Sequence, residues 1–230
     1  MDLQEYIYAL KNDSRQDSRL VVILPEIWGI TSFTKDLALL IQDATRLNVI
    51  VLDFYQPLGL GPIALPYDEA GTSLARQYKE DLKGEQFLSL WQNDFSKYMH
   101  DHYPQVSNIA VIGFCFGGRL SWLAGTDFNV KQIFSFYGAG PHDSYCHGLG
   151  SVEYLAANRK SKDLECYGFY GELDESVSAL DRDMTKQILS QQYSYQEYIF
   201  PAQHAFMNPN RPRFDADSCQ KATRILLDHL

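Results

Sequence analysis

One stretch decides the fold of this chain: Val111-Ile112-Gly113-Phe114-Cys115-Phe116-Gly117-Gly118-Arg119-Leu120. It begins as a buried strand rich in β-branched residues, passes through G-x-C-x-G-G, and continues into a helical pattern. A nucleophile on a sharp strand-to-helix turn needs glycine neighbours, because sheet and helix come too close there for a Cβ. The N-terminal amides of the following helix favour a thiolate. Cys115 is therefore the candidate nucleophile, and the alternative is a buried cysteine that packs as a small hydrophobic residue.

Strand-like and helix-like segments alternate on both sides of this turn. The continuous apolar runs are typical of strands buried on both faces of a parallel sheet, and the longer amphipathic stretches are typical of helices. The expected strands are 20–24, 49–52, 109–112, 133–136, 166–170 and 195–200, and the expected helices are 33–46, 85–102, 118–125, 177–189 and 214–229. This order predicts an α/β fold, with a mostly parallel central sheet and helices on both faces.

Residues 1–230 contain no repeat or linker that indicates a second domain, so we expect a single domain. Two segments depart from the alternating pattern. Residues 56–71 are rich in glycine and proline, and residues 138–163 carry four glycines and a short helix-like patch at 152–158. Ligands of open α/β sheets bind beyond the carboxyl ends of the strands. Both excursions are therefore expected to be walls of a site.

Composition excludes several classes of protein. The 230 residues are 45% hydrophobic and 21% charged, with a net charge of −9, which is a globular and acidic balance. An acidic surface repels phosphate backbones and anionic lipid, so we expect neither nucleic acid nor membrane as a partner. The longest apolar runs fall far short of the roughly 20 residues of a membrane span, and no secretory signal is evident. Four cysteines form no disulfide framework. We expect a cytoplasmic monomer or small homo-oligomer.

An acid and a histidine follow Cys115 in the chain order of a nucleophile–acid–histidine triad. Asp174 comes in a turn just beyond an expected strand, and His204 follows the last expected strand directly. Asp174 could alternatively cap a helix, and Glu172 and Glu175 are rival acids. Asp174 is preferred because it lies one turn outside the strand.

The end of the first long strand, Pro25-Glu26-Ile27-Trp28-Gly29, supplies the fourth element. A backbone amide there, assigned to Ile27, and the amide of Phe116 after the nucleophile would form an oxyanion hole. Glu26 is an acid beside the expected reaction centre; the alternative is a surface carboxylate or a salt-bridge partner.

With these pieces in order, the chain resembles the dienelactone hydrolase family, a cysteine-dependent branch of the α/β-hydrolases. The matching segments span 25–206 and also include Tyr137-Gly138-Ala139-Gly140, Gly171-Glu172-Leu173-Asp174 and His204-Ala205-Phe206. The resemblance implies a single-domain α/β-hydrolase fold without a cofactor. It also implies a small-molecule substrate, a lactone or activated ester, that is cleaved through a cysteine thioester.

The resemblance also implies residue roles. Cys115 is the nucleophile, His204 the base, Asp174 its orienting acid, and Glu26 modulates the resting thiol. The candidate substrate contacts are Trp28, Tyr137, Arg76 and Phe206. The family places an arginine shortly after the catalytic histidine, where this chain has Asn208. Lys79, Arg211 and Arg213 are the other candidate cations; a cationic pocket predicts a carboxylate-bearing lactone and a neutral one a plain ester.

Three alternatives remain. His142, Cys146 and His147 could ligate zinc with Asp143, but adjacent ligands match no common site, so no metal is expected. A non-catalytic ligand-binding protein on a hydrolase scaffold is the main alternative function. Redox sensing through Cys115 would require a resolving cysteine supplied by the fold, because no C-x-x-C motif contains it.

Overall fold

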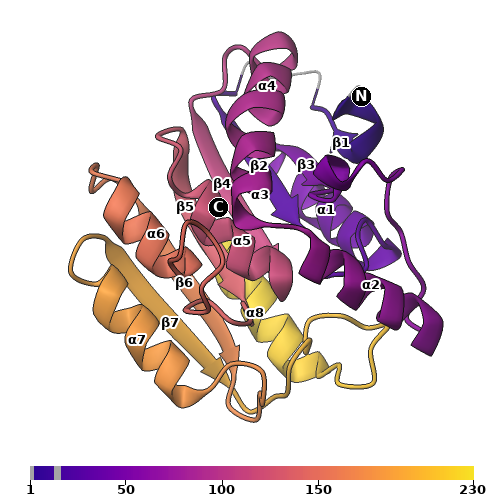
Figure 1. Ribbon diagram of the computed structural model, residues 1–230, viewed down its shortest axis with the longest axis vertical. Helices are drawn as coiled ribbons and strands as arrows, with labels where there is room; N and C mark the ends of the chain where they lie inside the picture. The colour runs from indigo at the N-terminus through magenta and orange to yellow at the C-terminus, as the bar shows by residue number, and fades with distance from the viewer. Residues whose placement is uncertain (1–2, 13–16) are drawn as a thin grey trace.

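A seven-stranded sheet forms the centre of the computed structural model, which describes residues 3–12 and 17–230 (Figure 1). The strands are β1 (Ile7–Leu10), β2 (Arg19–Leu24), β3 (Asn48–Leu52), β4 (Asn108–Phe114), β5 (Val130–Phe136), β6 (Glu165–Gly171) and β7 (Ser194–Phe200). They lie in the order β1-β3-β2-β4-β5-β6-β7, and all neighbours are parallel except β1 and β3. The predicted fold class, a mostly parallel α/β sheet, is confirmed.

The helices alternate with these strands along the chain. They are α1 (Ser32–Thr45), α2 (Glu69–Asp81), α3 (Gly84–Ser89), α4 (Ser96–His102), α5 (Phe116–Ala124), α6 (Ser151–Asn158), α7 (Ala179–Leu189) and α8 (Ala216–His229). Shorter turns are η1 (Leu3–Tyr6) and η2 (Gln56–Leu58), and η3 (Leu90–Phe95) is a π-helical stretch between α3 and α4. The expected helix over 85–102 is therefore α3, η3 and α4 in succession.

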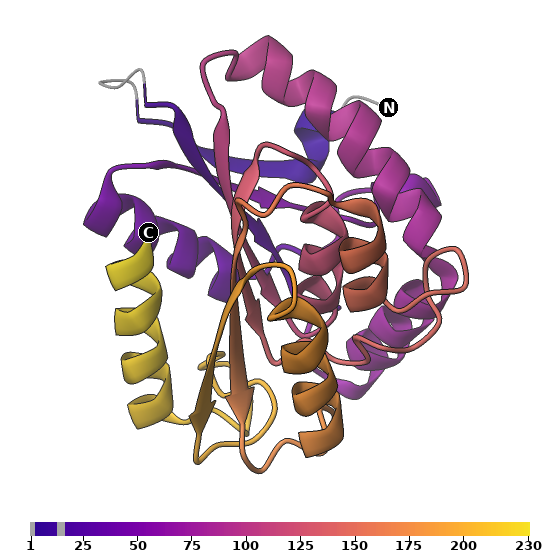
Figure 2. The ribbon, with the colours of Figure 1, turned by 90° about the vertical axis from the view of Figure 1, so that its left-hand side faces the viewer.

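Alternate strand residues face two separate hydrophobic layers, as the period of two of a strand requires. Val22 of β2 packs in the layer under α3–α7, whereas Val21 and Ile23 pack in the layer under α1 and α8. Figure 2 shows α1 and α8 on one side of the sheet and the remaining helices on the other. Helices on both faces explain why the central strands are apolar throughout.

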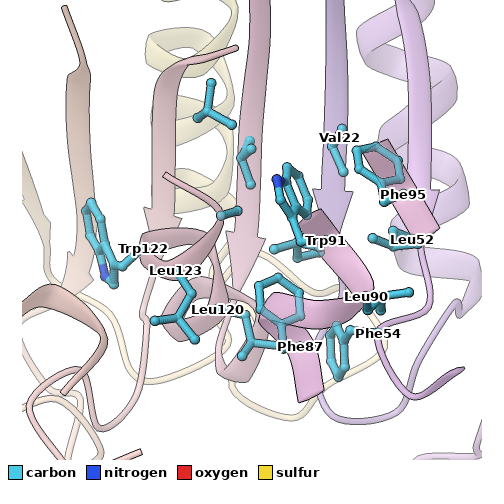
Figure 3. Close-up of a cluster of buried hydrophobic side chains, with 14 of the residues drawn as sticks. Val22, Leu52, Phe54, Phe87, Leu90, Trp91, Phe95, Leu120, Trp122 and Leu123 are labelled. Carbon is cyan, nitrogen blue, oxygen red and sulfur yellow. The ribbon is translucent and has the colours of Figure 1, made fainter. Parts of the chain in front are cut away.

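The larger layer is built around aromatic side chains of the α3–η3–α4 segment. Phe87, Trp91 and Phe95 pack between Val22 on the sheet and Leu120 on α5 (Figure 3). The three rings succeed one another at four-residue steps along one helix face and are all essentially buried. This layer fixes α5, the helix that follows Cys115, against the sheet.

Two elements were not predicted. The helix α2 buries only Gly71 and Ala75 along its length, so its sequence carries almost no apolar stripe. The strand β1 is a short, partly buried edge strand. No helix among the described residues is both long and apolar enough to cross a membrane.

Candidate active site

Cys115 occupies a strained turn between β4 and α5. Its backbone angles are φ 53° and ψ −113°, in the region that residues with a side chain rarely adopt. Residues held in such conformations cluster at functional sites, where the surrounding structure holds the strain. The thiol is partly exposed. The turn predicted from the sequence is therefore present, and it leaves the sulfur accessible.

The glycines around Cys115 are required by close backbone packing. A Cβ on Gly113 would lie 2.2 Å from the carbonyl oxygen of Gly117, and one on Gly117 would lie 2.3 Å from the carbonyl oxygens of Leu24 and Pro25. Real Cβ atoms do not approach backbone that closely. The start of α5 thus rests directly on the end of β2, which brings the segment after Leu24 beside Cys115.

His204 and Asp174 form a hydrogen-bonded pair beyond the ends of neighbouring strands. Asp174 follows β6, His204 follows β7, and His204 Nδ1 lies 2.7 Å from Asp174 Oδ2. The other carboxylate oxygen accepts the amide of Ser176 at 2.7 Å, and the Asp174 side chain is fully buried. Asp174 therefore orients the imidazole, as the order of residues predicts.

His204 and Cys115 lie on the wall of the same cavity, and Cys115 influences the pKa of His204. Burial lowers the pKa of His204, but the charge and hydrogen bonds of Cys115 and Asp174 outweigh it and raise this pKa to about 10. Neighbouring groups that favour the charged form of an imidazole raise its pKa. The structure thus pairs His204 with Asp174 and places Cys115 and His204 on one cavity wall, and the action of the three residues as a triad stays a prediction.

The two expected oxyanion-hole amides belong to buried residues on the wall of the same cavity. Ile27 follows β2, Phe116 begins α5, and both residues line the cavity with Cys115. Among the described residues, neither backbone N–H donates to another backbone carbonyl. These two N–H groups are free to donate hydrogen bonds to an oxygen that develops negative charge in the cavity.

Glu26 is buried on the wall of the same cavity and held by a neutral amide. Asn208 Nδ2 donates to Glu26 Oε2 at 2.6 Å and also lies 3.0 Å from the hydroxyl of Tyr67. Burial raises the pKa of Glu26, and the hydrogen bond from Asn208 and the charges of His204 and Arg211 only partly oppose that rise. Asn208 therefore contacts Glu26 from the position where the family resemblance predicts an arginine.

A cavity of about 470 Å³ opens onto Cys115 and is rich in basic side chains. Its basic residues are Arg76, Lys79, Arg119, Arg211 and Arg213, and its acidic residues are Glu26, Asp143 and Asp181. All four cations considered from the sequence lie on its wall, and Arg119 was not considered. Its position directly after Gly118, at the start of the helix behind the nucleophile, is the signal that could have identified it.

Arg211 lines the cavity, whereas Asn208, which stands where the family resemblance predicts an arginine, does not. The loop after His204 folds back so that the Arg211 guanidinium lies 4.1 Å from the Trp28 ring centre and 5.5 Å from that of Tyr67. Stacking on aromatic faces is a favourable arrangement for a guanidinium. Among the described residues, no ion pair of Arg211 with a carboxylate is found. Its charge is thus positioned by rings and remains available to an anion.

The remaining predicted contacts divide into two groups. Trp28 and Arg76 line the cavity, whereas Tyr137 and Phe206 do not. The ring of Tyr137 packs edge-on against His204 at 5.0 Å, and Phe206 lies behind Tyr137 at 5.4 Å. Both rings are fully buried, so Tyr137 packs against the imidazole and Phe206 packs against Tyr137, and neither ring contacts the cavity.

The two excursions also differ. Residues 138–163 contribute Ala139, Gly140 and Asp143 to the wall, whereas 56–71 contribute none. Instead, the 56–71 segment pairs with the Trp28 loop, through Leu65 N–H to Trp28 O at 2.9 Å and Ile30 N–H to Ile63 O at 2.8 Å. The neighbouring wall comes from α2, through Thr72, Arg76 and Lys79.

Comparison with known proteins places this geometry in a family. The model of the dienelactone hydrolase family matches residues 6–230. A Synechocystis protein provisionally named a carboxymethylenebutenolidase is 25% identical over 88% of this chain and 81% of its own length. A Saccharomyces cerevisiae protein with the same provisional name is 27% identical over 98% and 85%. A provisionally named dienelactone hydrolase structure from Klebsiella pneumoniae superposes with a TM-score of 0.72 at 19% identity, over 91% of this chain and 85% of that one.

Proposed function

This chain belongs to the dienelactone hydrolase family, and we propose that it is a hydrolase that cleaves a lactone or activated carboxylic ester through a thioester on Cys115. The observation that supports the proposal is that Cys115, on a strained turn, shares a cavity wall with His204, whose ring lies 2.7 Å from the buried carboxylate of Asp174. A nucleophile, a base in contact with it and an acid that orients the base are the parts that acyl transfer requires.

In the first half-reaction, the Cys115 thiolate attacks the substrate carbonyl and forms a carbon–sulfur bond. The carbon–oxygen bond to the leaving group then breaks, and the His204 imidazolium donates its proton to the leaving oxygen. In a lactone that oxygen stays attached to the acyl chain. The amides of Ile27 and Phe116 stabilise the oxyanion that develops in this step.

In the second half-reaction, neutral His204 removes a proton from water, and the hydroxide attacks the thioester carbonyl. The carbon–sulfur bond breaks, which releases the carboxylic acid product and restores the thiolate. Asp174 keeps the imidazole in the required orientation in both halves and stabilises its charged form. Because its pKa is raised, His204 stays protonated beside the thiolate of the resting enzyme. The same raised pKa makes it a weak acid, so it protonates poor leaving groups slowly. Activated esters and enol lactones therefore suit this site.

The substrate that fits the cavity best carries a carboxylate near the scissile bond. Arg76, Arg211 and Arg213 lie on the cavity wall, and among the described residues no salt bridge joins any of the three to a carboxylate. A guanidinium binds a carboxylate through two parallel hydrogen bonds, which fixes the ligand's orientation as well as its charge. The lactone or ester is thus expected to be anionic.

Replacement of the nucleophile tests the proposal. Turnover of a p-nitrophenyl ester by Cys115→Ala should fall at least about a thousandfold, because loss of a nucleophile removes the covalent route. Cys219→Ala is the matched control, since Cys219 is also a partly exposed free thiol. In His204→Gln, mass spectrometry should detect an acyl adduct on Cys115. Undiminished turnover by Cys115→Ala would overturn the proposal.

A non-catalytic binding protein is the competing function, and a panel of esters and lactones discriminates between the two. Saturable binding by the wild-type protein without turnover of any member would favour that reading. The presence of all three residues favours the enzyme, because a binding site gains nothing from a nucleophile beside a base.

A further inference from the structure

A second group of reactive side chains lies in the 138–163 excursion, apart from the residues used above. Cys146 and His147 stand at the tip of a short hairpin, and Glu85 projects toward them from α3. One ligand atom from each of the three residues lies within 4.8 Å of the other two. In residues 3–12 and 17–230 no other trio of potential metal ligands of this kind occurs.

The backbone around this group is fixed before any ligand arrives. Cys146 and Leu149 pair in both directions, with N–H to O distances of 3.0 and 2.9 Å, which closes the turn that contains His147. The hairpin is joined to the α3 side by Tyr145 OH to Leu82 O at 2.9 Å and by the His147 amide to Glu85 Oε1 at 2.6 Å. The position of the hairpin relative to α3 is therefore held by hydrogen bonds of both main chain and side chains.

Close packing at Gly84 adds to this rigidity. A Cβ on Gly84 would lie 2.7 Å from the Cβ of Cys146 and 2.7 Å from the carbonyl oxygen of Tyr145. The hairpin can approach α3 this closely only because residue 84 is glycine. This contact holds Cys146 beside Glu85, the residue after Gly84.

The three side chains differ in exposure in a way that suits a metal ion. Cys146 is fully buried, whereas the side chains of His147 and Glu85 are 62% and 43% exposed. The His147 ring stacks on Tyr154, with centroids 5.8 Å apart and planes at 25°, which restricts its orientation. A sulfur at the base and two solvent-facing ligands leave the outer position open to water.

We propose that Glu85, Cys146 and His147 bind a divalent transition-metal ion of borderline softness, with Zn²⁺ as the ion that fits best. Thiolate, imidazole and carboxylate are the three ligand types that zinc accepts, and a water completes a four-coordinate site. Ligands at zinc-bond lengths in a tetrahedron lie about 3.3–3.6 Å apart. His147 Nδ1 and Glu85 Oε1 are 3.7 Å apart, and all three ligand atoms lie within 4.8 Å of one another, so binding requires the side chains to draw together by about 1 Å at most.

His142 is not part of this site, although the sequence groups it with Cys146 and His147. Its Nδ1 lies 2.6 Å from Glu153 Oε1, and its Nε2 lies 3.0 Å from Thr185 Oγ1 and from the carbonyl of Asp181. The third ligand comes instead from Glu85, about 60 positions earlier in the chain, which spacing arguments cannot identify. A bound ion would join the hairpin to α3 and so hold the excursion that supplies Asp143 to the cavity wall.

Cobalt substitution tests the site. Untagged protein carrying Cys115→Ser, so that the active-site thiol cannot bind metal, is freed of metal with a chelator and titrated with Co²⁺. We expect one Co²⁺ per chain and a thiolate-to-cobalt charge-transfer absorption. The absorption should vanish with Cys146→Ala, and binding should weaken at least about tenfold with Glu85→Gln or His147→Asn. The matched controls Cys219→Ala and His100→Asn should bind as the Cys115→Ser protein does.

Two results would overturn the site: no charge-transfer absorption at saturating Co²⁺, or an absorption that survives Cys146→Ala. Glu85 and His147 are exposed, so their variants should fold, and circular dichroism checks this. At equal Zn²⁺ concentration, the rise in unfolding temperature should be smaller for Glu85→Gln than for the wild-type protein, since a ligand stabilises the native state in proportion to its affinity. The inference does not depend on the proposed function, because ester turnover by Glu85→Gln is expected to equal that of wild type.

Discussion

Glu26 is a buried acid whose carboxyl group has the neutral Asn208 as its only hydrogen-bond partner among the described residues. Its second oxygen, Oε1, is also buried, and none of the described residues donates to it. A carboxylate in this situation has lost its water without gaining a counter-ion in contact, so burial favours the protonated form. An arginine at position 208 would reverse this preference by pairing with the charge. The single residue Asn208 thus makes the charge of Glu26 depend on pH and on its neighbours.

The pH dependence of stability should follow from this raised pKa. Between the unfolded-state pKa of a glutamate and the higher folded-state pKa of Glu26, the folded protein binds more protons, so wild type loses stability as pH rises through that window. Glu26→Gln removes this pH-dependent contribution to the free energy of unfolding, because glutamine does not ionise. We measure the free energy of unfolding of both proteins by urea denaturation. The value for Glu26→Gln minus the value for wild type should increase as pH rises, by at most about 1.4 kcal/mol per pH unit. An unchanged difference between acidic and neutral pH would contradict a raised pKa.

The strand–turn–helix element around Cys115 depends on glycine at the point where α5 meets β2. Gly117→Ala would place a Cβ 2.3 Å from two backbone oxygens, which only a shift of the helix or strand can relieve. We expect a loss of about 3 kcal/mol or more in the free energy of unfolding, at the upper end of overpacking effects.

Gly61→Ala is the matched control for that substitution, because a Cβ there would meet nothing within 4 Å. It should leave the free energy of unfolding within about 0.5 kcal/mol of wild type. Equal effects of the two alanines in urea denaturation would show that the contact between α5 and β2 is not tight.

Elements with strong local signals were predictable, and elements that depend on tertiary contacts were not. The strands β2, β3, β4 and β6 contain continuous apolar or aromatic runs, and α5 follows the glycine turn, and both signals are local. Helix α2 has few apolar residues and buries only Gly71 and Ala75. Strand β1 exists only because β3 offers it an edge. A sequence pattern indicates an element through its apolar residues, so short elements or elements poor in apolar residues, such as β1 and α2, are not found from it.

The candidate site follows the same rule. Cys115, Asp174 and His204 were predictable because each follows a strand whose carboxyl end lies at one edge of a parallel sheet, visible in Figure 1 as arrowheads pointing the same way. The position of Arg211 was not, because it depends on a loop folding back onto Trp28. Tyr137 was expected on the cavity wall, but it lies beneath His204 because its own backbone turns there, at φ 39°. One domain over residues 1–230 stays a prediction.

The charged residues on the cavity wall are mainly basic, whereas the whole chain is acidic. The chain carries a net charge of −9, yet the cavity at Cys115 has five basic and three acidic residues on its wall. A concave site focuses the field of its charges, so its local potential can differ in sign from that of the surrounding surface. An anion is therefore repelled by most of the protein and attracted at one opening. We therefore expect the cavity to bind an anionic ligand more tightly than a neutral one.

The effect of salt measures that field. For a p-nitrophenyl ester with a free carboxylate, kcat/KM should fall about three- to tenfold as ionic strength rises from about 0.01 M to about 1 M, because the Debye length shrinks from about 30 Å to about 3 Å. A neutral ester of equal chain length should change little. Arg211→Gln should lower kcat/KM for the anionic ester by about tenfold, through loss of a charge-assisted contact, and leave the neutral ester unaffected. If both esters respond equally to salt and to Arg211→Gln, the cationic wall does not select the substrate, and a plain ester becomes the better candidate.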